Sequence, residues 1–137
     1  RTNLRTLTPE AIRGAANLTV ADLSFISPEL VLPALSACTE PDGDLLPMVK
    51  PQFEVGKQRL GSGGVVHDPQ LRAEAVVAVA AVAAELGWHT VGLCRSPLPG
   101  PSGNVEFFLW LRRQVARPLD ADRIAELVVC AAEGETP

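Results

Sequence analysis

The sequence is poor in the residues that build metal and disulfide sites. Cys38, Cys94 and Cys130 are far apart and form no C-x-x-C pair, and His67 and His89 are isolated. Neither a disulfide framework nor a zinc site is therefore indicated, and we expect no bound metal. An odd number of scattered cysteines is typical of a reducing, cytoplasmic location.

The sequence also lacks a long hydrophobic run and an excess of positive charge. Its longest apolar stretch, Ala75 to Ala84, lies between two glutamates and is much shorter than the roughly 20 residues that cross a membrane. With 12 basic and 16 acidic side chains the formal charge is −4. Affinity for phosphates comes from clustered Lys and Arg. We therefore expect no membrane partner, and any RNA affinity should come mainly from outside this chain.

The composition is that of one folded α/β domain. The 137 residues are 47% hydrophobic and only 20% charged, which excludes a disordered chain. Periodicity and turn residues predict four strands and three helices. The strands are expected at 18–21, 45–49, 88–94 and 105–111, and the helices after Pro28, at 69–86 and at 120–132. The sheet should be mostly parallel and close with an antiparallel hairpin, because the last two strands lack a crossover helix between them.

Three further expectations concern the connections and the core. Asp42-Gly43 predicts a turn, and Pro51 to Asp68, which lacks periodicity, predicts a long loop. Trp88 and Trp110 lie in strand patterns, so both are expected in the core.

Three ionisable residues stand where strand-like runs begin or end. Asp22 follows the first run, Lys50 follows the second, and Glu106 lies at the start of the last. Open α/β sheets bind ligands in crevices at the carboxyl ends of their strands. An Asp, a Lys and a Glu in such places indicate proton-transfer chemistry.

Four motifs carry a resemblance to a known family. They occur in the order VADLSFIS, MVKPQFEVG, GGVVHDP and SPLPGPSGNVEFFLWL. The stretch from Arg1 to about Leu111 thereby resembles the C-terminal part of the TlyA or hemolysin-A group of ribosomal RNA 2′-O-methyltransferases, relatives of the FtsJ enzymes. The resemblance implies the second half of a Rossmann-like class I methyltransferase sheet, S-adenosylmethionine as cofactor, and 2′-O-methylation of cytidine ribose in ribosomal RNA or ribosomal subunits.

The resemblance also implies roles for the three ionisable residues. The family uses a Lys-Asp-Lys-Glu tetrad, in which Asp22 matches the acid after the fourth strand, beside the cofactor, and Glu106 matches the final acid. Lys50 matches the second lysine and would serve as base or orient the hydroxyl. The first lysine, the glycine-rich cofactor loop and an S4-like RNA-binding domain are expected upstream of this chain. Residues 1–137 would then be the C-terminal portion of the enzyme, inactive alone.

Five further residues are candidates for RNA contact. Phe25 is expected either to stack on an extruded base or to lie in the core. Ser102 and Asn104 could hydrogen-bond the nucleotide or simply form a turn. Lys57 and Arg59 could contact phosphates or be solvated.

Two other classes of function stay open at this point. One is a non-enzymatic RNA- or protein-binding fragment of a split methyltransferase. The other is a membrane-active hemolysin, against which the lack of a membrane-length segment argues.

Overall fold

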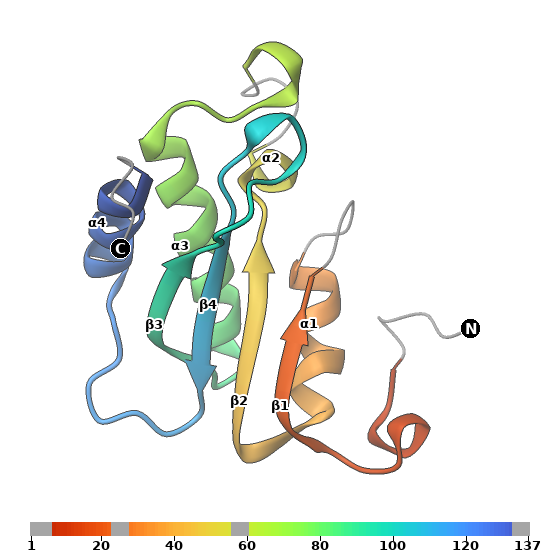
Figure 1. Cartoon of the computed structure of the whole chain (residues 1–137). Coiled ribbons are helices and arrows are strands. Elements are labelled where there is room, and N and C mark those ends of the chain that lie inside the picture. Colours follow the sequence, from red (N-terminus) through yellow and green to blue (C-terminus); the bar gives the residue numbers. More distant parts are fainter. Residues whose placement is uncertain (1–6, 23–27, 56–60, 133–137) are drawn as a thin grey trace.

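The computed structural model describes residues 7–22, 28–55 and 61–132 (Figure 1). Strands and helices alternate along most of the chain, as the periodicity predicts. A short 3-10 helix, Pro9–Ile12, precedes the first strand. The main elements are β1 (Ala16–Ala21), α1 (Pro28–Ala37), β2 (Thr39–Val49), α2 (Pro51–Glu54), α3 (Pro69–Glu85), β3 (His89–Arg95), β4 (Phe107–Arg112) and α4 (Ala121–Ala132).

The four strands form one mixed sheet with the order β1-β2-β4-β3. β1 and β2 are parallel, whereas β4 is antiparallel to both of its neighbours. The predicted antiparallel hairpin of the last two strands is confirmed. The expectation of a mostly parallel sheet needs correction, because β4 returns between β2 and β3 and leaves one parallel pair. Three strands still point the same way, but β3 does not pair with β2.

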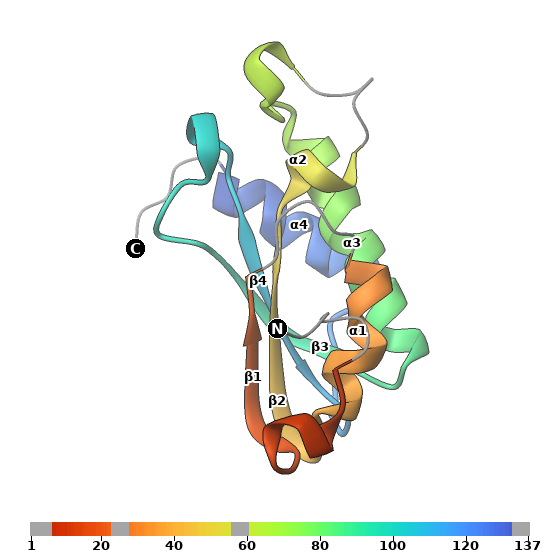
Figure 2. The same ribbon diagram turned by 90° about the vertical axis from the view of Figure 1, so that its right-hand side faces the viewer.

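The hydrophobic core lies on one face of this sheet. Side chains alternate between the two faces of a strand, and Leu45 and Val49 of β2 point to the same side as Phe107, Leu109 and Leu111 of β4. All five are fully buried. They pack with α1, α3 and α4 in one cluster, and the helices cover this face of the sheet (Figure 2).

The predicted helix ends are confirmed by their caps. Asp68 Oδ1 accepts a hydrogen bond of 2.8 Å from the Gln70 N–H at the start of α3. Asp120 Oδ1 accepts one of 2.8 Å from the Arg123 N–H at the start of α4. Such caps satisfy N–H groups that have no partner within the helix. Gly87, with φ +87°, ends α3 in the left-handed region that glycine favours.

Two predictions about connections are wrong in part. Asp42-Gly43 is no turn but lies inside β2, where the register with β1 shifts by an irregularity between Ala16 and Leu18. β2 accommodates these residues because position 43 is a glycine. A Cβ at this position would lie only 2.7 Å from the Asn17 carbonyl oxygen. The expected loop after β2 begins instead with the short helix α2.

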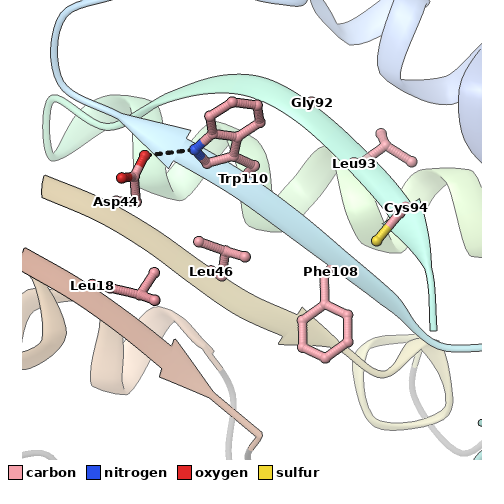
Figure 3. Close-up of a pocket in the computed structure, with 8 residues that line it drawn as sticks. All are labelled: Leu18, Asp44, Leu46, Gly92, Leu93, Cys94, Phe108 and Trp110. Carbon is pink, nitrogen blue, oxygen red and sulfur yellow. Dashed lines mark hydrogen bonds between the residues drawn. The ribbon is translucent and has the colours of Figure 1, made fainter. Parts of the chain in front are cut away.

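The opposite face of the sheet is not covered by the described helices. Trp88 is buried, as predicted, but Trp110 is 43% exposed on this open face, where its Nε1 donates a hydrogen bond of 2.7 Å to Asp44 Oδ1. A hollow of about 450 Å³ lies here (Figure 3). It is lined mainly by apolar side chains, with Leu18, Leu46 and Phe108 among them.

No helix within the described ranges is long and apolar enough to cross a membrane.

Candidate functional site

Asp22 and Lys50 meet at the carboxyl ends of two neighbouring strands. β1 and β2 run side by side in the same direction (Figure 1). Asp22 directly follows β1 and Lys50 directly follows β2, so both residues lie at the same edge of the sheet. Lys50 Nζ lies 2.6 Å from Asp22 Oδ1. The Lys50 side chain is only 9% exposed, whereas that of Asp22 is 62% exposed. The ion pair therefore joins a buried ammonium group to a carboxylate that faces solvent.

Glu106 reaches the same edge through the antiparallel pairing of β2 with β4. Val49 pairs with Phe107, the last residue of β2 with the first residue of β4. Lys50 and Glu106 are each one residue beyond this pair, so they lie at adjacent strand ends. Glu106 is buried, at 5% exposure. The structure thus brings the three predicted catalytic residues to one end of the sheet; their roles remain a prediction.

Gln52 is a site residue that the sequence analysis missed. It belongs to α2, which begins directly after Lys50, and its Nε2 donates a hydrogen bond of 2.8 Å to Glu106 Oε2. The available signal was its position in the Lys50-Pro51-Gln52-Phe53 segment of a recognised motif. Polarity alone did not reveal it, because a glutamine in a predicted loop is ordinarily solvated.

Asn104 holds two loops together near this edge. Its Oδ1 accepts a hydrogen bond of 2.9 Å from the Val66 N–H, and its Nδ2 donates one of 3.1 Å to the Gly64 carbonyl oxygen. Asn104 is 3% exposed, whereas Ser102 is exposed with φ +60°. These bonds favour the structural alternative for Asn104; RNA contact by either residue stays a prediction.

Arg72 supports the same loop from α3. Its Nε donates a hydrogen bond of 3.1 Å to the Val66 carbonyl oxygen, and the residue is 9% exposed. Burial, and then the nearby charge of Arg95, lowers the pKa of the Arg72 guanidinium, while Asp68 opposes this shift. The segment before α3 is therefore fixed by buried polar contacts on two sides.

Three predicted RNA-contact residues lie outside the described residues, namely Phe25, Lys57 and Arg59. Within the described ranges, no group of three or more His, Cys, Asp or Glu side chains could hold a metal ion. The described site offers an ammonium group that is paired with one carboxylate, with a second carboxylate at the adjacent strand end. Such a group can orient a hydroxyl and stabilise negative charge that develops on its oxygen.

Comparisons with known proteins show which family the chain resembles. Residues 1–113 match the family described as FtsJ-like methyltransferase. The chain is 65% identical over 128 residues to the "16S/23S rRNA (cytidine-2'-O)-methyltransferase TlyA" of Mycobacterium tuberculosis, and this match covers 93% of the chain and 48% of the relative. It is 28% identical over 88 residues to "Hemolysin A" of Brachyspira hyodysenteriae, covering 64% of the chain and 37% of that relative.

A solved structure shares the fold. It is named "Putative hemolysin from Streptococcus thermophilus" and superposes with a TM-score of 0.84 at 32% identity, over 96% of this chain and 48% of the other. The chain thus spans about half the length, or less, of these three proteins. The family match extends over most of the chain and includes every residue of the described site. The chain therefore belongs to the FtsJ-like methyltransferase family.

Proposed function

We propose that this chain supplies the methyl-acceptor side of an S-adenosylmethionine-dependent site that methylates the 2′-hydroxyl of cytidine ribose in ribosomal RNA. The observation that carries the proposal is the buried Lys50 ammonium, held 2.6 Å from Asp22 at the sheet edge next to Glu106. The 65% identity to a relative named for this reaction supports the choice of substrate.

Lys50 is the residue that acts on the hydroxyl. A ribose hydroxyl is a weak nucleophile, because it gives up its proton reluctantly. In the ion pair with Asp22, Lys50 Nζ is an ammonium donor, which suits it to hold the 2′-oxygen and stabilise its developing charge. Acting as a base would require that Nζ first lose a proton. Either way, the 2′-oxygen forms a bond to the methyl group while the bond from the methyl group to the sulfonium sulfur breaks. The hydroxyl proton passes to neutral Nζ or, if Nζ stays an ammonium, to water.

Asp22 and Glu106 are the residues that position Lys50 in this proposal. Asp22 Oδ1 forms an ion pair directly with the Lys50 ammonium, and the exposed side of this carboxylate can also face a positively charged ligand. S-adenosylmethionine, when bound, supplies a methyl group carried on a sulfonium sulfur. A carboxylate at the end of β1 suits that positive charge, so Asp22 is the residue of this chain that we expect beside the cofactor.

Ribosomal RNA, or a ribosomal subunit, is the proposed partner. The chain's net charge of −4 gives it little general affinity for phosphates. RNA affinity is therefore proposed to reside mainly in other parts of the full-length protein, as the matched relatives are about twice as long as this chain. Lys57 and Arg59 would add local phosphate contacts, and Phe25 would stack on the target base.

Methyl transfer by the full-length protein tests this function. Ribosomal subunits incubated with the protein and labelled S-adenosylmethionine should gain label, and nuclease digestion followed by mass spectrometry should identify it as 2′-O-methylcytidine. A Lys50→Met variant should leave the RNA unlabelled. Label on a base instead of a ribose, or no label with any ribosomal substrate, would contradict the proposal.

A further inference from the structure

Gln52 is a buried side chain whose amide is only half used in the described structure. The residue is 7% exposed, and its Nε2 donates a hydrogen bond of 2.8 Å to Glu106 Oε2. Its Oε1 is buried and has no hydrogen-bond partner among the described residues. A buried acceptor without a donor costs free energy, so another interaction must hold the amide in this orientation.

The charge of Glu106 explains why the amide keeps this orientation. A carboxylate only accepts hydrogen bonds, and the glutamine NH₂ group is the only part of the amide that can donate one. Rotating the amide by half a turn would place Oε1 against the carboxylate oxygen and remove a charge-assisted bond. Glu106 therefore sets the orientation of the Gln52 amide, which leaves Oε1 without a donor among the described residues.

Gly100 confines the same carboxylate from another direction. A Cβ at position 100 would lie 2.5 Å from Glu106 Cδ and closer still to Oε2. The backbone of Gly100 is fixed in turn, because its N–H donates a hydrogen bond of 2.8 Å to the Asn104 carbonyl oxygen. Glu106 thus lies between a donor on α2 and a loop backbone that leaves no room for a side chain.

We propose that Gln52 is a positioning residue of the proposed methyltransferase site. It fixes the Glu106 carboxylate beside Lys50, and the missing side chain of Gly100 provides the space in which the carboxylate lies. The inference rests on the proposed function and deepens it. Gln52 follows Lys50 by two residues, so α2 couples the position of Glu106 to that of the lysine.

Two substitutions disturb the carboxylate from opposite sides. Gln52→Met keeps the length of the side chain and removes the donor. Gly100→Ala adds one methyl group whose three nearest atoms all belong to the end of the Glu106 side chain. Gly100 does not have a positive φ, so the backbone conformation there suits alanine. Small misplacements in an active site can cost up to about 100-fold in rate.

Steady-state kinetics of the full-length protein provide the first test. Each variant should lower kcat for RNA methylation on the order of 10–100-fold, with KM for RNA and the Kd for S-adenosylmethionine nearly unchanged. The matched control is Gln70→Met, the same substitution at an exposed position on α3, which should leave kcat unchanged. An unchanged kcat in Gln52→Met would overturn the proposal. So would a fall in kcat that accompanies a lower melting temperature and is equally large in Gln70→Met.

A spectroscopic test separates this inference from the proposed function. The side-chain amide signals of Gln52 in a ¹⁵N-labelled protein should shift when Glu106→Gln removes the charged acceptor, while those of Gln70 should not. If the wild-type protein methylates no RNA, the proposed function fails, and this shift alone decides whether Gln52 positions Glu106. Gln52 signals that do not respond to Glu106→Gln would overturn the positioning role even in an active enzyme.

Discussion

The two polar pairs at the end of the sheet are built in different ways. Lys50 and Asp22 form an ion pair that is open to solvent on the carboxylate side, with Asp22 62% exposed. Gln52 and Glu106 form a neutral-to-charged hydrogen bond that is buried on both sides. The first pair, called the exposed pair below, can therefore meet a ligand through Asp22, whereas the second, buried pair has little contact with solvent.

This difference indicates that the two pairs have different roles within one site. A group that reacts must be reachable, while a group that orients it benefits from burial, because fewer competing interactions with water are available. Lys50 itself is 9% exposed, so the exposed Asp22 carboxylate is what opens this pair to a ligand. We propose that Lys50, paired with Asp22, performs the chemistry and that Glu106 with Gln52 provides the geometry. Asp22 stands between these roles, since it holds Lys50 and also faces outward.

Removing the ammonium group should have the largest effect. Lys50→Ala in the full-length protein should lower the rate of methyl transfer by about 10²–10⁴-fold, the range for removal of a proton-transfer group. Lys50→Arg should also be nearly inactive, because a planar guanidinium does not replace a compact ammonium and does not release its proton. Single-turnover transfer of labelled methyl groups to ribosomal RNA measures both variants. A Lys50→Arg variant with wild-type rates would show that only charge matters.

Neutralising each carboxylate should have a smaller and unequal effect. Glu106→Gln should reduce kcat by roughly 10²-fold, because it replaces a buried charge that orients the site. Asp22→Asn should reduce kcat less, because the amide oxygen can still accept a hydrogen bond from Lys50 and water reaches this exposed side chain. Asp22→Asn should in addition weaken S-adenosylmethionine binding. Equal kcat losses in the two variants would remove the contrast between the exposed and the buried pair.

Substitution of Asn104, next to the site, should have the smallest effect on the rate of methyl transfer but a clear effect on stability. Asn104→Ala removes two hydrogen bonds and leaves the buried Val66 N–H without its partner, which should cost about 2 kcal/mol. Ser102→Ala, at an exposed position two residues before Asn104, should change the free energy of unfolding by less than about 0.5 kcal/mol. Thermal unfolding of the two variants measures this contrast. An Asn104→Ala protein of normal stability but reduced RNA binding would favour the RNA-contact role instead.

Sequence reasoning predicted most of the fold because local signals governed it. The caps Asp68 and Asp120 and the glycine at 87 marked helix ends that depend on neighbouring residues only. The strand ends placed Asp22, Lys50 and Glu106 at one edge, since that follows from strand direction.

The rest depended on contacts between distant segments. The insertion of β4 between β2 and β3 is a matter of pairing partners, which periodicity does not specify. Asp42-Gly43 has the composition of a turn, yet the edge strand β1 accommodates it as an irregularity in β2. Trp110 has the pattern of a core residue, but alternation places it on the open face. Gln52 can be recognised as a site residue only in the structure, where its side chain in α2 donates a hydrogen bond to Glu106.

The affinity of Lys50→Ala for S-adenosylmethionine tests the central claim most directly. If this chain provides the acceptor side of the site, Lys50 acts on the ribose hydroxyl and not on the cofactor. Calorimetric titration of the full-length variant should then give a Kd within about threefold of wild type, a difference below ~0.7 kcal/mol, while methyl transfer is lost. A variant that loses cofactor binding together with activity would contradict the account.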